Sequence, residues 1–416
     1  MKKKTLIFSI IIAIAAVILC GCVTNQETGQ SEFFMTPFWR WVITDVFGFV
    51  QNYGLRVILL TVSLKLLLAP LDFFMRKKNK DNARILKRLE PDMEKLNKQY
   101  ANDPRELQAR KQQLQKANGY SMGASCIPMI ITMFLFITLF TGFTQMSQNM
   151  NIRAFKVLDT VYTDTITKVT DAEAAAAEGA YYEFFIDNYL IKNAVKPKKP
   201  TDAEKAAAEN RYKYDFTDAE AETKIQILKE FCAQREVFTA YRDGLAGYND
   251  GGAIKESFLW ITNVWQPDTW QNPVPSAADY AKLVGEDRID AGFYDGVMAY
   301  VTYEYSGVWN GWLILVFMSV GLNFLNQFIT RKQQGPAAAQ AAPGAPGMGG
   351  SMKMMMWIMP IMIGVFAFMY SSAFTLYMVV NAFMTLIVNL SSTGILYLLE
   401  KNRRDDGRVV KGKLVK

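Results

Sequence analysis

The most restrictive feature of this sequence is a set of apolar runs that are each long enough to cross a bilayer. About 20 residues of helix span the roughly 30 Å hydrocarbon core of a membrane. Runs of this length are too continuously apolar to be single faces of soluble helices or strands. Five of them follow the amino-terminal region, at residues 54–75, 122–143, 308–330, 354–372 and 373–399. The sequence therefore predicts an all-α polytopic membrane protein with five transmembrane helices.

The charge of the connecting segments predicts the orientation of these crossings. Residues 76–121 contain 13 basic and six acidic residues, residues 331–353 contain three basic residues, and residues 400–416 contain seven basic and three acidic residues. Residues 144–307 instead contain 17 basic and 26 acidic residues. Basic connectors stay in the cytoplasm. We therefore expect a multi-pass membrane protein with its amino terminus outside and its basic tail, residues 400–416, in the cytoplasm.

The first 21 residues have the pattern of a secretory signal. Lys2 to Lys4 precede an apolar stretch that ends at Leu19, which is typical of a signal peptide. The sequence Leu19-Cys20-Gly21-Cys22 resembles a bacterial lipobox, so we expect cleavage after residue 21 and lipidation (palmitate) of Cys22. An uncleaved anchor helix is the alternative. Both interpretations place residues 22–53 outside.

Aromatic and apolar side chains recur at helical spacing within residues 22–53. The set comprises Phe38, Trp41, Val42, Val46 and Phe49. This spacing predicts an amphipathic helix in the outer membrane interface. An extension of the first crossing is the alternative at its end.

The absence of histidine excludes several kinds of chemistry. The chain has no histidine and four cysteines, so it has no Ser-His-Asp triad and no histidine-based acid or base. Loss of Cys20 and lipidation of Cys22 would leave only Cys126 and Cys232, which are too few for a disulfide framework or a metal site. We expect a protein that is not an enzyme and holds no metal or cofactor.

The polar connectors predict two further structures. Residues 76–121 form a helical hairpin, because an apolar stripe at spacings of three and four ends at Asn102-Asp103-Pro104 and a second stripe begins at Leu107. Its basic surface faces anionic lipid or ribosomal RNA in one interpretation and is simply solvated in the other. Residues 331–353 contain a glycine-, proline- and alanine-rich stretch and should be a flexible loop.

Residues 144–307 should form a largely helical extracytoplasmic insert. Thr-Asp-Ala-Glu occurs three times, beginning at Thr170, Thr201 and Thr217. Threonine followed three residues later by glutamate is a capping box, so each copy should start a helix. A loop-rich end is expected around Trp260, Trp265 and Trp270 because prolines follow them closely.

Lys65 is a charged residue inside the first apolar run. It lies eleven residues before Arg76, which corresponds to about 16 Å along a helix. A charge near the bilayer centre costs about 2.5–3.5 kcal/mol on insertion scales. A water-containing cavity open to the cytoplasm would relieve this cost. Polar residues that could share the cavity, or else bond between helices in a dry bundle, are Thr132, Thr138, Asn323, Asn326, Gln327, Asn381 and Thr385.

Several short motifs together resemble the YidC/Oxa1/Alb3 family of membrane protein insertases, in its Gram-positive lipoprotein form. They are Lys65 five residues before Pro70-Leu71, the segment Leu89-Glu90-Pro91-Asp92-Met93, Cys126-Ile127-Pro128-Met129, the methionine-rich run from Met352 to Met362, and Leu376-Tyr377. The resemblance covers residues 36–331 apart from the outer insert, and residues 353–399.

The chain also departs from the family pattern in three places. Lys65 stands where the family usually has arginine, so bidentate carboxylate binding is lost. Residues 371–374 replace a proline-alanine-glycine motif, and Met378 replaces a tryptophan.

The resemblance implies an insertase that binds clients in a hydrophilic groove without nucleotide hydrolysis. The groove residues would be Lys65, Thr132, Thr138, Asn323, Gln327, Tyr377 and Thr385. Implied partners are nascent membrane proteins and the lipid bilayer, with the Sec translocon and the ribosome as further candidates and no specific nucleic-acid sequence. Two alternatives are a transporter or channel with an anion site at Lys65, and a surface lipoprotein whose insert binds a partner.

Overall fold

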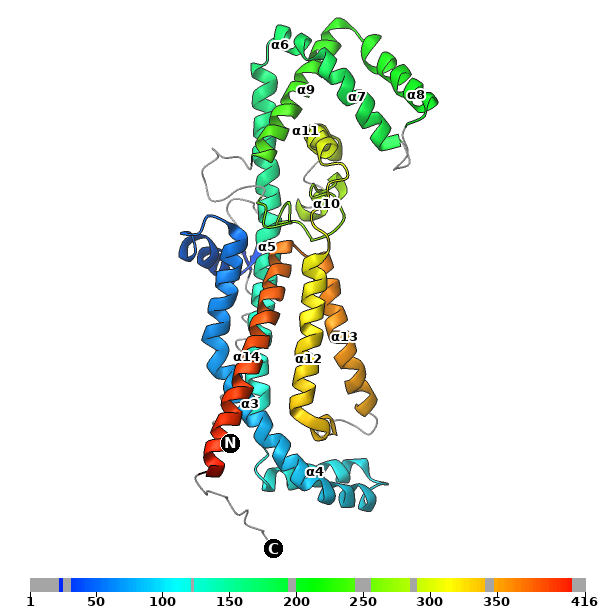
Figure 1. Cartoon of the computed structure of the whole chain (residues 1–416). Helices are drawn as coiled ribbons and strands as arrows, with labels where there is room; N and C mark the ends of the chain where they lie inside the picture. The colour runs from blue at the N-terminus through cyan, green and yellow to red at the C-terminus, as the bar shows by residue number, and fades with distance from the viewer. Residues whose placement is uncertain are drawn as a thin grey trace. The chain divides into compact units, whose positions relative to one another are not determined.

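The computed structural model describes residues 22–24, 31–120, 123–193, 200–243, 256–284, 290–340 and 348–405 (Figure 1). The chain divides into two compact units. One unit, which we call the helical bundle, comprises Pro37–Gly142 and Leu313–Lys416. The other, the outer unit, comprises Met1–Thr36 and Phe143–Trp312. The predicted signal peptide, residues 1–21, lies outside the described residues.

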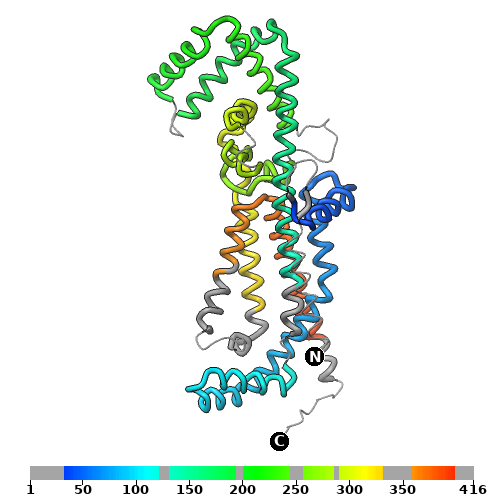
Figure 2. Tube along the Cα trace, turned by 180° about the vertical axis from the view of Figure 1, so that it is seen from behind, coloured from blue at the N-terminus to red at the C-terminus, as the bar shows by residue number. Residues whose placement is uncertain are grey.

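Long helices build the bundle. They are α3 (Tyr53–Gln99), α4 (Pro104–Ala117), the first part of α5 (Gly123–Lys168), α12 (Ile314–Gln340), α13 (Met348–Met369) and α14 (Ser372–Asp405), preceded by α2 (Thr36–Trp41) and η1 (Val42–Val46). Helix α14 packs against α3 and α12, and α12 also packs against α13 (Figure 2). Rings on α5, α13 and α14 meet at Phe140, whose ring centroid lies 6.1 Å from that of Phe366 and 5.1 Å from that of Phe374.

Two helices of the bundle, α3 and α14, are long and apolar enough to cross a membrane among the described residues. Only 17% of the most apolar stretch of α3 is buried, and Leu67 on this helix is 76% exposed. Helical faces that are this apolar and this exposed suit contact with lipid. The segments Ile314–Thr330 and Pro360–Met369 are shorter apolar helices. The chain is thus mostly helical, while the five-crossing topology stays a prediction.

Several element bounds differ from those expected from sequence. The first predicted crossing and the first arm of the predicted hairpin are one continuous helix, α3, which contacts α4. Helix α12 begins at Ile314 and not at residue 308. It continues to Gln340, and α13 begins at Met348, so helix covers most of the predicted flexible loop, of which residues 341–347 lie outside the described residues.

The outer unit is also mainly helical. It contains the second part of α5, α6 (Asp171–Ala176), α7 (Glu178–Asn193), α8 (Asp202–Tyr212), η2 (Lys213–Thr217), α9 (Ala221–Arg242), α10 (Ala277–Val284) and α11 (Ala291–Glu304). A two-stranded antiparallel sheet of β1 (Cys22–Thr24) and β2 (Ser31–Phe33) pairs Cys22 with Phe33. This small sheet is an exception to the predicted all-α fold.

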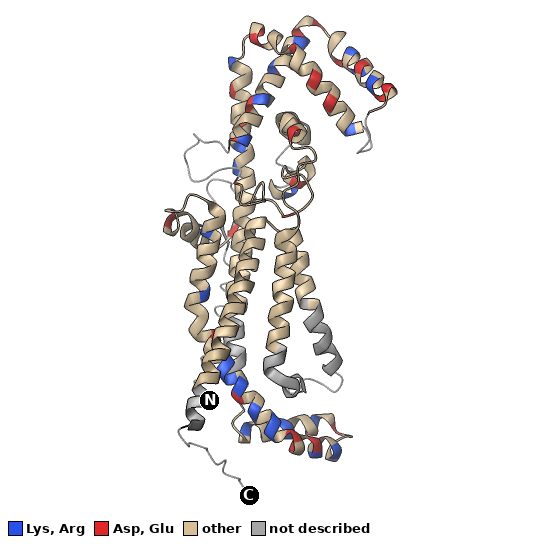
Figure 3. Ribbon diagram, in the orientation of Figure 1, with Lys and Arg blue, Asp and Glu red and all other residues tan. Residues whose placement is uncertain are grey.

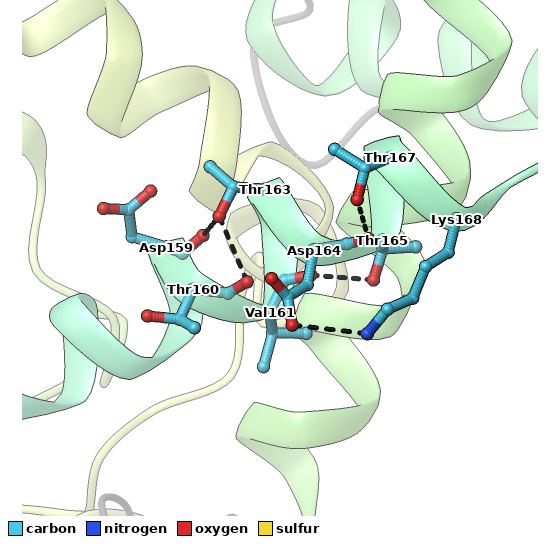
Figure 4. A network of polar contacts seen from close by, with 8 residues as sticks. All are labelled: Asp159, Thr160, Val161, Thr163, Asp164, Thr165, Thr167 and Lys168. Atoms are coloured by element: carbon cyan, nitrogen blue, oxygen red, sulfur yellow. Dashed lines mark hydrogen bonds and ion pairs between the residues drawn. The ribbon is translucent and has the colours of Figure 1, made fainter.

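Helix α5 extends past the predicted end of the second crossing and carries threonines well into the outer unit. Figure 4 shows Thr163, Thr165 and Thr167 donating their hydroxyls to carbonyls three or four residues earlier in the same helix, such as Thr165 to Val161 at 2.7 Å. These bonds satisfy polar groups that would otherwise compete with the helix. The helix can therefore supply the scaffold on which α9 and α11 build the core of the outer unit.

Two of the three predicted capping boxes are confirmed. Thr170 and Thr201 each accept a hydrogen bond from the glutamate N–H three residues on, and each glutamate side chain in turn accepts a hydrogen bond from the threonine N–H. The prediction for Thr217 is wrong, because Thr217 ends η2 and Glu220 stands at the N-cap position of α9, where its side chain makes no capping hydrogen bond. Phe216 is 2% exposed, and burial of its ring keeps this segment helical.

Candidate functional site

Lys65 and Asp72 form an ion pair on α3, inside the bundle. The Lys65 Nζ lies 3.9 Å from the Asp72 Oδ2, and the two side chains are 14% and 13% exposed. The residues are seven apart, beyond the usual three- or four-residue spacing of helical ion pairs. The pair lowers the cost of a buried charge, because each group compensates the other.

A pocket of about 360 Å³ lies beside this pair, between α3, α12 and α14. Its lining is Asp72, Met75, Arg76, Asn79, Lys80, Ala83, Thr330, Thr393 and Leu396. Burial, followed by the nearby Arg84 charge, lowers the pKa of Lys80. The pocket is therefore polar and mainly basic, and Asp72 connects it to Lys65. None of the groove residues predicted from the sequence is in this lining.

The predicted groove residues occupy several helices. Thr138 is fully buried and donates to the Leu135 carbonyl of its own helix, α5, at 3.0 Å. Asn323 on α12 donates to Ser319 at 2.8 Å, and Thr385 on α14 donates to Asn381 at 2.6 Å, again within one helix. Thr132 and Gln327 are half-buried. These contacts stabilise each helix and do not by themselves gather the residues around Lys65.

Tyr377 is buried in the aromatic cluster of the bundle. Its side chain is 7% exposed, and its ring centroid lies 6.0 Å from that of Phe374 in a stacked arrangement. The turn just before it separates α13 from α14. Thr375 is fully buried and donates its hydroxyl to the Ala367 carbonyl at 2.9 Å, which ties the two helices together across the turn.

Asn326 and Asn389 form an interhelical clamp, and only Asn326 was singled out from the sequence. The Asn326 amide donates to the Ala382 carbonyl of α14 at 2.8 Å. The Asn389 amide in turn donates to the Asn326 Oδ1 at 3.1 Å. The two side chains are 8% and 1% exposed. For Asn326 the structure thus gives the helix–helix alternative and not a groove lining. Its apolar surroundings on α14 were the sequence feature that could have identified Asn389.

Basic side chains gather on the second half of α3 and on α4 (Figure 3). On this part of α3 the predicted apolar stripe is the more buried face, with Leu86 5% exposed and Leu89 4% exposed. The Asp103 side chain caps α4 by accepting from the N–H groups of Arg105 and Glu106. The charged face is left open to solvent or to a partner.

The predicted amphipathic segment is helical as α2 and η1 up to Val46, and Phe49 lies in the turn that follows. Phe38, Trp41 and Phe49 are 45%, 54% and 77% exposed, whereas Trp39 and Ile43 are buried. A β-carbon on Gly142 would lie 3.0 Å from the Trp39 ring, so a side chain there would crowd this contact. The segment therefore packs on the bundle through Trp39 and presents the predicted aromatic side chains outward.

The cysteines and acidic residues offer little for metal binding. No group of three or more potential metal ligands occurs among the residues that the structure describes. Cys232 on α9 is a free thiol, and burial raises its pKa. Cys22, the predicted lipidation site, is the first residue of β1.

A family model described as 60Kd inner membrane protein matches residues 45–185 and 236–395, which is more than half of the chain. The chain belongs to this family. The resemblance to the YidC/Oxa1 proteins is thereby confirmed. The two matched ranges include both ends of the predicted outer insert. Within the insert, only residues 186–235 lie outside the family model.

Curated relatives named "Membrane protein insertase YidC" match parts of the chain. The protein of Oceanobacillus iheyensis is 33% identical over 34% of this chain and 58% of its own length. The protein of Alkalihalophilus pseudofirmus is 32% identical over 32% of this chain and 55% of its own length. A Leptospira interrogans relative is 30% identical over 30% of this chain, but the match spans only 20% of its own length. No solved structure matches the chain.

Proposed function

We propose that this protein is an insertase of the bacterial plasma membrane, which inserts nascent membrane proteins and helps them fold. The observation that carries the proposal is the charged pair of Lys65 and Asp72 inside a lipid-exposed apolar helix, beside a polar pocket. Family membership and the names of the relatives support it.

The proposed mechanism begins with a client segment that is polar and often acidic. The basic faces of α3 and α4 receive the client, and the pocket admits its polar segment. An ammonium has three N–H donors, so Lys65 can bind a client carboxylate while Asp72 stays nearby. The apolar helix of the client then moves into lipid, where burial of its side chains drives the step without nucleotide hydrolysis.

The proposed topology follows the charge pattern. Five helices cross the membrane, the chain from Cys22 starts outside with its lipid on that residue, and the basic tail stays in the cytoplasm, where it attracts the ribosome through phosphate contacts. The Sec translocon is a second candidate partner.

The test is insertion by the purified protein in liposomes. A small single-spanning client with an acidic outer segment is added without nucleotide, and its protease-protected fraction is measured. We expect insertion above that of empty liposomes, and a lower yield with Lys65→Ala. Lys205→Ala, on the exposed surface of α8 in the outer unit, is the matched control and should leave the yield unchanged. Insertion no higher than in empty liposomes would refute the proposal.

The transporter alternative rests on the same pair, because an intramembrane lysine beside a basic pocket could also bind an anionic solute. Solute flux into vesicles that depends on the protein and on Lys65 would favour it.

A further inference from the structure

The loop of residues 256–276 in the outer unit exposes apolar side chains in an unusual way. Phe258 and Ile261 pair through two backbone hydrogen bonds of 3.0 and 2.9 Å, and this turn carries Leu259 at its tip. Leu259 is 73% exposed and has a φ of 53°. A bulky non-glycine residue at positive φ is strained. The backbone at Leu259 is therefore strained, and burial of the leucine side chain within the protein does not offset this cost.

Three tryptophans extend this apolar surface. Trp270 is 56% exposed, and Trp309 and Trp312 are 44% and 62% exposed with ring centroids 4.8 Å apart. Residues 257–276 and 305–313 contain one ionisable side chain with a carboxylate or ammonium, Asp268, and it is fully buried. Glu256, at the start of the loop, is half-buried. The surface of Leu259 and these three tryptophans, which we call the tryptophan loop surface, is thus built from two segments that are poor in charge, in a unit whose sequence is acidic overall.

Asn310 fixes the loop to the segment of the outer unit that precedes α12 in the chain. It is 1% exposed, and its side-chain nitrogen lies 2.9, 3.1 and 2.7 Å from the carbonyl oxygens of Asn263, Gln266 and Pro267. Its Oδ1 accepts from the Asn263 N–H at 2.7 Å. A β-carbon on the next residue, Gly311, would lie 2.0 Å from the Asp268 carboxylate. The loop is therefore bonded to a segment only a few residues before the apolar helix begins at Ile314.

We propose that the tryptophan loop surface inserts into the outer interface of the bilayer and anchors the outer unit there. Tryptophan is enriched at the level of the lipid headgroups, where its ring is buried and its N–H stays hydrated. Continuity with α12 keeps the surface near this level, since Trp309 and Trp312 lie only five and two residues before Ile314 and an extended chain spans at most about 3.6 Å per residue. Burial of the Leu259 side chain in the lipid interface also offsets the strain of its backbone. The inference uses α12 as a membrane crossing and does not depend on insertase activity.

The test measures which quenchers reach the loop. A fluorescent non-natural amino acid replaces Leu259 or Trp270 in the full-length protein, which is reconstituted in nanodiscs of phosphatidylcholine and phosphatidylglycerol. The matched control is Tyr214, which is 72% exposed in the same unit but lies beside Arg211 and Asp215. Lipids with a nitroxide near the headgroup should quench positions 259 and 270 and spare position 214. Aqueous iodide should show the reverse order.

Two results would overturn the proposal. Iodide quenching at positions 259 and 270 as strong as at position 214 would place the loop in water. Protection from both quenchers would mean that protein, such as a second copy, covers the surface. Protease resistance equal to that of the native protein checks that each labelled variant is folded. Because the measurement requires no client, its outcome is separate from that of the insertion assay.

Discussion

Replacing Lys65 by methionine should destabilise the bundle, because it leaves the Asp72 carboxylate buried without its partner. At the observed 3.9 Å separation, two unit charges attract by about 4 kcal/mol in an effective dielectric of about 20. Both side chains are less than 15% exposed, so solvent screens this attraction little. Removal of one member of a buried pair typically costs about 3–5 kcal/mol. Since the adjacent pocket gives Asp72 some access to water, we expect the free energy of unfolding to fall by about 3 kcal/mol.

The double variant Lys65→Met with Asp72→Asn separates stability from function. Neither residue then carries a charge, so the free energy of unfolding should return to within about 1 kcal/mol of the native value. Insertion should stay low in both variants, because each lacks the ammonium. Thermal unfolding in detergent gives the stabilities of the two single variants and the double variant, and liposome assays give insertion. Strictly additive stability losses would refute the ion pair, and recovery of insertion by the double variant would refute a direct role for Lys65.

Three further predictions concern an interhelical hydrogen bond, a close helix contact and a helix cap. Asn326→Leu removes two interhelical hydrogen bonds and should lower bundle stability by about 1–2 kcal/mol, whereas Asn323→Ala, which loses a bond within one helix, should cost less; thermal unfolding compares them. Gly364→Ala puts a β-carbon 2.7 Å from a Val320 methyl group and should cost about 1–3 kcal/mol by overpacking, and an unchanged melting temperature would contradict that contact. Thr170→Ala should weaken the start of α6 by about 1 kcal/mol, seen as faster hydrogen exchange, while Thr217→Ala should have no such effect. Because hydrogen bonds from Thr170 lower the pKa of Glu173, this cap should be complete above the ordinary glutamate pKa and be lost as pH falls through the lowered value.

Helix positions followed well from local sequence because apolar runs and capping residues act over short distances. The two confirmed capping boxes illustrate this, since threonine and glutamate three residues apart satisfy each other without distant help. The third copy failed because the same four residues follow Phe216, whose burial outweighs the local cap. Tertiary packing, which a tetrapeptide does not encode, decided the backbone there.

The site was harder to predict because its contacts join residues that local rules do not pair. Lys65 stood out as a charge in an apolar run, but its partner lies seven residues away, where helical spacing gives no neighbour. The pocket lining came from α3, α12 and α14, which meet only through the fold. Polar residues in the predicted crossings gave no indication of whether they bond within a helix, as Thr385 does, or between helices, as Asn326 does.

The most direct test of the account uses one client in acidic, neutral and basic versions of its outer segment. Insertion of each is measured with the native protein and with a charge-exchanged variant, Lys65→Glu with Asp72→Lys, which keeps an ion pair but reverses the charge at position 65. The account predicts that the native protein inserts the acidic client best and that the variant shifts the preference towards the basic client. The same order of clients with both proteins would contradict the claim that the charge at residue 65 receives the client.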